Sequence, residues 1–217
     1  MISAIILAGG QGSRMKSSCV KQLLPFKGKL VLHHSVELFL FSGLVDEVIV
    51  VLAQPYRTHC PYQNISFAEP GARRQDSLAH GFAKISPQSK YILVHDAARP
   101  LVKLSDIKNL ITEGKKAGAA TLAVPSKSTL KERDALGHVV KTLPRAHIWE
   151  VQTPQFLERS IAERGLTRAS AENIAVTDDV SLAELVGHKV KLVEGSYSNI
   201  KLTTAEDLPL LEALYET

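Results

Sequence analysis

The chain has 217 residues, of which 45% are hydrophobic and 22% charged, an ordinary composition for a globular protein with a sizeable core. The formal net charge is +4, but lysines and arginines alternate with acids, which ranks nucleic acid below small phosphorylated ligands. No apolar run of about eighteen residues and no basic N-terminal leader is present, and two cysteines suit a reducing compartment. We therefore expect no membrane partner and a cytoplasmic location.

The first apolar run, residues 4–8, is short and partly β-branched and ends in glycines, so it predicts a buried strand. The glycine-rich turn at residues 9–12 leaves backbone N–H groups uncovered, and these can converge on an anion. Arg14 and Lys21 add positive charge close to the turn, which favours a polyphosphate ligand. A tight surface turn between two elements is the alternative interpretation.

This turn completes neither of two common nucleotide-binding motifs. It is not a Walker A loop, because no Gly-Lys-Ser/Thr follows at the required spacing. It is not a full dinucleotide fingerprint either, because Met15 occupies the position of the last glycine. A nicotinamide-dependent dehydrogenase is therefore disfavoured.

Helical and strand patterns alternate up to residue 124. Strands are predicted at 48–52, 65–68, 91–94 and 119–124, and helices at 30–41, 73–85 and 104–116. This alternation predicts an α/β fold, a Rossmann-like open and mostly parallel sheet flanked by helices. Such sheets bind ligands at the carboxyl ends of their strands, where the glycine turn and His95-Asp96 both fall.

The alternation breaks at roughly residues 125–150. Residues 126–131 and 138–143 alternate polar with apolar side chains around Asp134-Ala135-Leu136-Gly137, which predicts a β-hairpin arm too polar for the core. An excursion of this size commonly packs on a neighbouring subunit, and a flexible surface flap is the alternative.

Beyond the arm, Thr153-Pro154-Gln155 returns the chain to the main body. The remaining patterns predict a helix at 180–186 that ends at Gly187, a final strand at 189–193, and a last helix at 204–215 with Thr204 as its N-cap. We expect one domain over residues 1–217, with the arm inserted in it.

Asp96 is the candidate metal ligand. A carboxylate at the end of a buried strand, beside a phosphate-binding turn, suits Mg²⁺, which usually takes one or two carboxylates together with phosphate oxygens and waters. Alternatively, Asp96 caps the following turn or pairs with Arg99. The eight histidines lack metal-ligand spacing and no Gly-x-Ser-x-Gly elbow is present, so zinc and a serine hydrolase are disfavoured.

Five basic residues are ambiguous when taken alone, because most lysines and arginines simply solvate a surface. These are Arg73, Arg74, Lys127, Arg145 and Lys201.

In sequence order, the motifs resemble those of the bacterial 2-C-methyl-D-erythritol 4-phosphate cytidylyltransferases over nearly the whole chain. The glycine turn alone is shared by many nucleotidyltransferases, whereas the ordered set is specific. The set comprises the glycine turn with Arg14, Lys21-Gln22, Gly71 with Arg74 and Ser77, His95-Asp96-Ala97-Ala98-Arg99-Pro100, Thr129, Arg145, Thr153-Pro154-Gln155, Thr177-Asp178-Asp179 and Asn199-Ile200-Lys201.

The resemblance implies a fold of the nucleotide-diphospho-sugar transferase type. It also implies a Mg²⁺-dependent transfer of a cytidylyl group from CTP to methylerythritol phosphate in isoprenoid precursor biosynthesis, with release of pyrophosphate. In this reaction the sugar phosphate attacks the α-phosphorus of CTP directly. The family arm reaches into a homodimer partner, so Thr129 and Arg145 would serve the other subunit's site.

The same resemblance implies a role for each matching residue. Charge stabilisation at the pentacoordinate phosphorus falls to Arg14 and Lys21, and positioning of the attacking phosphate to Arg145 and Lys201. Contacts with the triphosphate fall to Ala8, Gly9, Gly10 and Gly12, and contacts with the cytidine to Gly71 and Ser77. Contacts with the sugar phosphate fall to Arg99, Thr129, Thr153 and Thr177, and ligation of Mg²⁺ to Asp96.

Two positions depart from the family pattern. Leu7-Ala8-Gly9-Gly10 stands where the family often has Pro-Ala-Ala-Gly, and Pro70 stands where a glycine is frequent. The nearest alternative is a ribitol-5-phosphate cytidylyltransferase, which usually carries Ser-Val before the arginine of the 95–100 motif. A sugar-phosphate nucleotidyltransferase that uses another base and a non-catalytic nucleotide-binding module are more distant alternatives.

Overall fold

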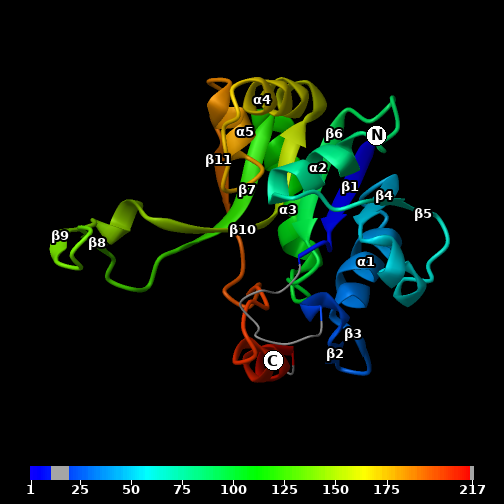
Figure 1. The fold of residues 1–217 in the computed structure, drawn as a ribbon, viewed down its shortest axis with the longest axis horizontal. Helices are drawn as coiled ribbons and strands as arrows, with labels where there is room; N and C mark the ends of the chain where they lie inside the picture. The colour runs from blue at the N-terminus through cyan, green and yellow to red at the C-terminus, as the bar shows by residue number, and fades with distance from the viewer. Residues whose placement is uncertain (11–19, 216–217) are drawn as a thin grey trace.

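The computed structural model describes residues 1–10 and 20–215. Its main sheet is built from β1 (Ile2–Leu7), β4 (Glu47–Val51), β5 (Ile65–Ala68), β6 (Tyr91–Asp96), β7 (Ala119–Pro125), β10 (Trp149–Glu158) and β11 (Lys191–Glu194). The seven strands lie in the order β11-β7-β10-β6-β1-β4-β5 (Figure 1). All neighbouring pairs are parallel except those of β10, which runs antiparallel to β6 and to β7. The predicted open, mostly parallel sheet is confirmed.

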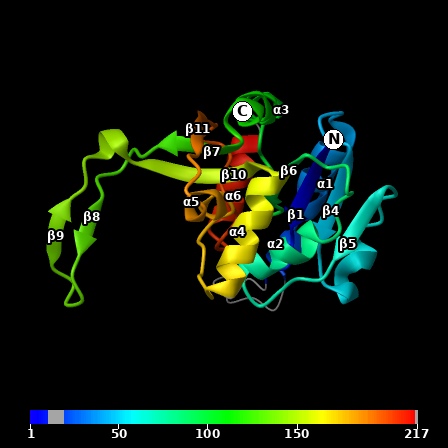
Figure 2. The same ribbon diagram turned by 90° about the horizontal axis from the view of Figure 1, so that it is seen from above.

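Helices cover both faces of this sheet, as the view from above shows (Figure 2). One face carries α1 (Val31–Phe41) and α3 (Leu104–Ala117), and the other carries α2 (Arg74–Phe82), α4 (Arg159–Ala171) and α5 (Ser181–Leu185). The last helix is α6 (Asp207–Tyr215), whose Leu211 belongs to a small third core together with Phe26 of β2 (Pro25–Phe26). The strand β2 pairs with β3 (Lys29–Leu30). In the part of the chain that the structure describes, no helix is long and apolar enough to cross a membrane.

The sheet has a hydrophobic core on each of its two faces, and this explains why the sequences of its strands are continuous apolar runs. Successive side chains of a strand point to opposite faces, so Ile6 packs with α1 and α3 while Ile5 packs with α2. Both isoleucines are fully buried. Burial of each such side chain contributes about 1.5–3 kcal/mol relative to exposure. This rigid sheet fixes where its strand ends lie.

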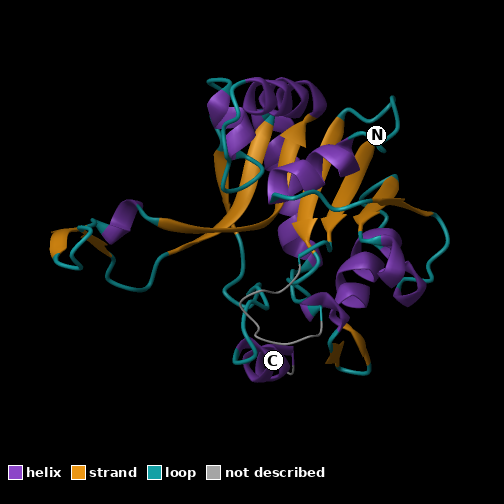
Figure 3. Cartoon of the chain, in the orientation of Figure 1, coloured by secondary structure: helices purple, strands orange, loops and turns teal. Residues whose placement is uncertain are grey.

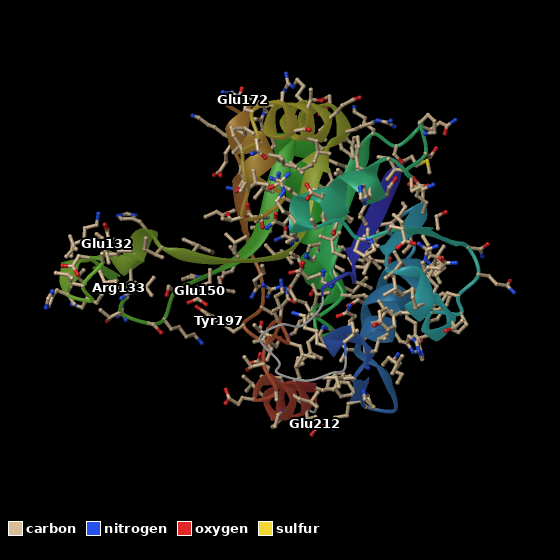
Figure 4. The ribbon with its side chains drawn as sticks, viewed as in Figure 1. Glu132, Arg133, Glu150, Glu172, Tyr197 and Glu212 are labelled. Atoms are coloured by element: carbon tan, nitrogen blue, oxygen red, sulfur yellow. The ribbon has the colours of Figure 1, made fainter. Side chains whose placement is uncertain are left out.

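The predicted arm is confirmed and projects away from the sheet between β7 and β10 (Figure 3). It contains β8 (Lys131–Arg133), β9 (Val139–Thr142) and the single turn η4 (Arg145–His147). The strand predicted at 126–131 was wrong, because β8 begins only at Lys131, whereas β9 lies within the strand predicted at 138–143. The β8–β9 pairing contains a register shift between Glu132 and Arg133. Every residue of β8 and β9 is exposed, and the labelled Glu132 and Arg133 lie far from the main body (Figure 4).

The sequence analysis did not predict the short strands β2 and β3, nor two longer elements of the main body, β10 and α4. A proline in the middle of β10 argues against a strand, and here the Thr153–Pro154 bond is cis and the pairing register with β7 shifts. The buried face of α4 consists largely of small residues, so its apolar periodicity is weak. A Cβ on Gly165 would lie 2.6 Å from Leu182 Cβ, which shows that this face must be small for α5 to approach.

The predicted start of the last helix was wrong. The helix begins at Asp207 rather than near residue 204, so Thr204 is not its N-cap. The Asp207 carboxylate instead accepts hydrogen bonds from the backbone N–H groups of Thr203 and Thr204, at 2.7 and 2.8 Å. These bonds stabilise a turn ahead of the helix and delay its first residue.

Candidate active site

A cleft of about 420 Å³ opens at the carboxyl end of β1. We call it the glycine cleft, and its lining residues are Leu7, Gly9, Gly10, Pro70, Gly71, Ala72, Arg73, Arg74 and Ser77. They come from the turn after β1 and from the segment that joins β5 to α2. The cleft therefore lies where ligands bind in open α/β sheets.

Close backbone approach explains two of its glycines. A Cβ on Gly9 would lie 2.3 Å from Pro70 Cβ, and a Cβ on Gly71 would lie 2.4 Å from Asp76 Cβ. Real side chains do not tolerate such distances, so both positions require glycine. Pro70, a departure from the family pattern, thus packs directly on the turn after β1.

The N-terminus of α2 also faces this cleft, because its first residue Arg74 lines it. Gly71 N–H donates to Ser77 Oγ at 2.9 Å, and Arg73 N–H donates to the Asp76 carboxylate at 3.0 Å. These bonds fix the path of the chain into the helix. Helix N-termini favour anions, so the cleft suits a phosphorylated ligand.

Lys21 and Ala8 do not line the cleft but lie next to its glycines. A Cβ on Gly10 would lie 3.9 Å from Lys21 Cε, which places this lysine side chain beside the turn. Ala8 itself is buried under the cleft, and its carbonyl oxygen accepts a hydrogen bond from Gln22 Nε2. The predicted contacts of Gly12 and Arg14 lie outside the described residues.

A second cavity of about 340 Å³ opens beside the first. We call it the cation pocket, and its lining residues are Arg74, Asp96, Arg99, Val151, Gln152, Thr153, Gln155, Thr177, Asp178 and Lys201. Three cations and two carboxylates thus face one small space. Such a lining suits an anionic ligand that also carries hydroxyl groups.

Asp96 lies at the centre of this charge cluster. Its carboxylate accepts hydrogen bonds from Lys201 Nζ at 2.6 Å and from Arg74 Nη2 at 3.0 Å, and Arg99 Nε lies 3.9 Å away. Burial disfavours the ionised carboxylate, but the charges of Arg74 and Lys201 outweigh it and hold the pKa of Asp96 below its usual range. Asp96 therefore stays negative at neutral pH. Arg99, the alternative partner suggested by the sequence, makes the longest of these three contacts.

A closed ring of hydrogen bonds connects the pocket residues Arg99 and Thr153 to each other through His95 and Asn199. His95 Nδ1 bonds with Thr153 Oγ1 at 3.1 Å, and His95 Nε2 bonds with the Arg99 carbonyl oxygen at 3.2 Å. Arg99 Nη1 donates to the Asn199 carbonyl oxygen at 2.6 Å, and Asn199 Nδ2 donates to the Thr153 carbonyl oxygen at 2.9 Å. Burial lowers the pKa of His95 to about 4. The ring joins β6 and β10 to the loops that carry Arg99 and Asn199, and it fixes the positions of Arg99 and Thr153.

Arg74 connects the two cavities, because it lines both. Its guanidinium group donates to Asp96 on one side and to Asp179 on the other. Asp179 is 1% exposed, and Gln155 Oε1 accepts the backbone N–H of Asp179 at 2.8 Å. Two buried carboxylates therefore hold one arginine between the cavities.

The fold gathers most of the predicted site residues at one end of the sheet. Gly9, Gly10, Gly71 and Ser77 line the glycine cleft, and Asp96, Arg99, Thr153, Thr177 and Lys201 line the cation pocket. Thr129 and Arg145 line neither cavity of their own chain. Both are exposed on the arm, where Arg145 Nη1 donates to the Lys127 carbonyl oxygen at 3.1 Å.

Sequence reasoning gave no role to four residues that build this site. Arg74, Gln155, Asp179 and Asn199 all belong to the quoted family motifs, but nothing in their local pattern separates them from surface polar residues. The usable signal was their occurrence within those short motifs rather than any spacing. Their partners come from elements about 20 to 105 positions away in the chain.

The donor set bears on metal binding. Among residues 1–10 and 20–215, no group of three or more His, Cys, Asp or Glu side chains has the arrangement of a metal site. Asp178 accepts a hydrogen bond from Ser181 N–H, and Asp179 binds Arg74 and does not line the cation pocket. Asp96, which binds Arg74 and Lys201, lines the pocket at the end of β6. A single carboxylate fits Mg²⁺ held mainly by phosphate oxygens of a ligand, and it does not fit an independent metal centre.

Comparison with known proteins identifies the family. The family profile described as 2-C-methyl-D-erythritol 4-phosphate cytidylyltransferase matches residues 2–217. A chloroplastic protein of that name from Oryza sativa subsp. japonica is 43% identical over 98% of this chain and 74% of its own. One from Pelotomaculum thermopropionicum is 38% identical over 98% of this chain and 93% of its own.

Solved structures agree with this result. A 4-diphosphocytidyl-2C-methyl-D-erythritol synthase from Anaerococcus prevotii has a TM-score of 0.88 and 30% identity, covering 100% of this chain and 98% of its own. A 2-C-methyl-D-erythritol 4-phosphate cytidylyltransferase from Francisella tularensis has a TM-score of 0.86 and 31% identity, covering 98% and 99%. Profile, sequences and structures each match nearly the whole of this chain, and the chain belongs to the 2-C-methyl-D-erythritol 4-phosphate cytidylyltransferase family.

Proposed function

We propose that the glycine cleft binds CTP and that the cation pocket binds methylerythritol phosphate. The reaction is that of the family, transfer of a cytidylyl group from CTP to 2-C-methyl-D-erythritol 4-phosphate in isoprenoid precursor biosynthesis, which gives 4-diphosphocytidyl-2-C-methyl-D-erythritol and pyrophosphate. The main support for this assignment is that Arg74 lines both cavities, so the two cavities adjoin each other. Two ligands that react with each other must meet, and these cavities meet there.

In the glycine cleft, the backbone and the N-terminus of α2 favour the triphosphate. Gly9 and Gly10 present main-chain atoms without side chains in the way, and Lys21 adds a positive charge beside them. Ala8 keeps its proposed triphosphate contact from the family motif. Gly71 and Ser77, joined by their hydrogen bond, border the part of the cleft assigned to the cytidine. Arg14 and Gly12 keep their proposed roles at the triphosphate from the family motif.

In the cation pocket, Lys201 and Arg99 provide the positive charge for the phosphate of the acceptor. Thr153 and Thr177 line the same space and offer hydroxyl groups to the sugar alcohol. A phosphate oxygen of the acceptor attacks the α-phosphorus directly, and the bond to the pyrophosphate oxygen breaks. Such transfers depend on positioning and on charge stabilisation, and the pocket supplies both.

We further propose that Asp96 holds Mg²⁺ when CTP is bound. The carboxylate stays ionised at neutral pH, because the neighbouring cations depress its pKa. When bound, Mg²⁺ would neutralise part of the charge on the triphosphate and on the leaving pyrophosphate. Arg74 and Lys201, which bind Asp96 here, would then share that carboxylate with the metal.

The arm supports a proposal of a homodimer. Thr129 and Arg145 carry family roles at the acceptor, yet both lie on an arm that projects away from its own pocket. A two-fold partner would bring the arm of one chain to the pocket of the other. Exposed Leu136, Val139 and Val140 give the arm an apolar surface that a partner would cover.

Pyrophosphate release tests the proposed function. The protein is supplied with Mg²⁺ and CTP, and methylerythritol phosphate or ribitol 5-phosphate is added as the acceptor. ATP, GTP and UTP replace CTP in parallel reactions. We expect turnover with CTP and methylerythritol phosphate. If the protein used ribitol 5-phosphate but not methylerythritol phosphate, or another nucleotide but not CTP, the assignment of the two cavities would be overturned.

A further inference from the structure

None of the roles proposed above gives Arg74 a direct contact with a substrate. Among the described residues, it is the only one that lines both the glycine cleft and the cation pocket. The α-phosphorus of CTP is bonded to the nucleoside and is attacked by the acceptor. It must therefore lie where the nucleotide site and the acceptor site meet, which is beside Arg74.

Four of the five N–H donors of this guanidinium group are engaged. Nε and Nη2 donate to Asp96 Oδ1 at 3.3 and 3.0 Å, Nη2 also donates to Asp179 Oδ2 at 2.7 Å, and Nη1 donates to Asp179 Oδ1. An arginine has five donors in a fixed plane, so one N–H on Nη1 has no partner among the described residues. Within residues 1–10 and 20–215, that N–H is therefore not committed to a protein acceptor.

Asp179 makes this arrangement rigid. Its side chain is 1% exposed, and Gln155 Oε1 accepts the backbone N–H groups of Asp179 and Val180 at 2.8 and 2.9 Å. The carboxylate is thus fixed from β10 before any ligand binds. Without Asp179, only Asp96 would hold Arg74, and the guanidinium group would be drawn towards the cation pocket.

We propose that Arg74 donates its remaining Nη1 hydrogen to a non-bridging oxygen of the α-phosphate, and that Asp179 is the positioning residue that holds it there. Arg74 keeps its proton throughout. The acceptor oxygen forms its bond to the α-phosphorus while the bond to the pyrophosphate oxygen breaks, and Arg74 stabilises the charge on the equatorial oxygen. This inference rests on the proposed function, because it needs CTP in the glycine cleft.

The two diastereomers of CTP α-thiotriphosphate test the contact. Each replaces a different non-bridging α-oxygen by sulfur, which accepts hydrogen bonds poorly. We expect the wild-type protein to use one diastereomer at least about tenfold more slowly than the other. Arg74→Lys and Arg74→Met should lower kcat with normal CTP about 100-fold and should reduce this ratio several-fold. A merely structural role would lower both rates together and leave the ratio unchanged.

Asp179 is tested by the same ratio. Asp179→Asn keeps the shape but removes the charge, so kcat should fall roughly tenfold, the ratio should decrease, and KM for methylerythritol phosphate should stay close to the wild-type value. The double variant Arg74→Met/Asp179→Asn leaves no unpaired buried charge, and it carries the test if a single variant does not fold. The matched control is the exposed pair Arg168–Glu172, where Arg168→Met and Glu172→Gln should leave rate and ratio unchanged.

Two results would overturn the proposal. One is equal use of the two diastereomers by the wild-type protein. The other is a wild-type ratio in folded Arg74→Lys or in the folded double variant. Failure of the proposed function would look different, because the wild-type protein would then release no pyrophosphate from normal CTP.

Discussion

Lys201 Nζ donates a hydrogen bond to Asp96 Oδ2 at 2.6 Å, which joins the loop after β11 to the end of β6 across 105 positions of sequence. The Asp96 side chain is 9% exposed and that of Lys201 is 31% exposed, so the lysine reaches from the pocket surface to a buried anion. Asp96 therefore fixes the cation that we assign to the acceptor phosphate.

Replacement of Lys201 should affect the acceptor more than the nucleotide. We expect Lys201→Met to lower kcat/KM for methylerythritol phosphate about 100-fold, because a charge-stabilising donor is lost, while the Kd of CTP changes little. Steady-state kinetics and a CTP titration measure the two effects. Lys116→Met, which removes an exposed lysine paired with Glu113, is the control. A larger loss in CTP affinity than in acceptor use would contradict the assignment of the cation pocket.

Asp96 should be required together with a divalent cation. Asp96→Asn should reduce turnover at least about 100-fold, because it removes both the proposed Mg²⁺ ligand and the anion that holds Arg74 and Lys201. Treatment of the wild-type protein with a chelator should abolish turnover, and added Mg²⁺ should restore it. Glu113→Gln is the matched control for loss of a surface carboxylate. Full activity of the chelated protein would exclude the metal proposal.

The contact between Gly9 and Pro70 should be intolerant of any side chain. Gly9→Ala would place its Cβ 2.3 Å from Pro70 Cβ, so we expect a loss of about 1–3 kcal/mol in the free energy of unfolding and weaker CTP binding. Gly10→Ala is the steric control, since the nearest atom, Lys21 Cε, would be 3.9 Å away. Thermal melting compares the two. Equal melting temperatures of the two variants would show that Pro70 moves aside at little cost, which would contradict the prediction.

The sequence predicted the central sheet well, because the end of the apolar run in β1, β4 and β6 is marked by glycine, proline or charged residues. It did not predict β10 or α4. The proline in β10 hides a strand that sheet pairing on both sides enforces, and the small residues of α4 serve close helix packing rather than apolar periodicity. Both omissions arise from tertiary contacts.

For the site, local pattern predicted the position of Asp96 and of the glycine turn, both at strand ends. It gave Arg99 only as an alternative partner of Asp96, and it did not predict that Lys201 and Thr153 would lie beside Asp96, because these two residues come from other elements. Only the family resemblance assigned them. Roles for Arg74 and Asp179 required the coordinates, because the meaning of a buried ion pair depends on which cavities it separates.

The arm should complete the site of a partner. Lys21→Ala and Arg145→Ala should each be inactive alone, since one is proposed to act at the nucleotide and the other at the partner's acceptor. After dissociation and reassembly in equal amounts, half of the dimers carry one intact site, so the mixture should recover about a quarter of wild-type activity. Mixing without dissociation is the control. A mixture that stays inactive after subunit exchange would count against shared sites.

Cys60 should be chemically inert in the folded protein. Burial raises the pKa of its thiol to about 11, so almost none of the reactive thiolate is present at pH 8, and the side chain is 1% exposed. In a Cys19→Ser variant, a thiol reagent at pH 8 should therefore react only after denaturant is added. In the unfolded chain the thiol is no longer buried, so its reactivity should increase as the pH approaches the ordinary pKa of a thiol. Rapid native labelling would show that the loop around Cys60 opens.

A crystal structure with CTP and methylerythritol phosphate bound tests the central claim most directly. We predict the cytidine beside Gly71 and Ser77, the α-phosphate at the boundary of the two cavities next to Arg74, and the acceptor phosphate at Lys201. A triphosphate bound away from the glycine cleft, or an acceptor bound away from the cation pocket, would contradict the account.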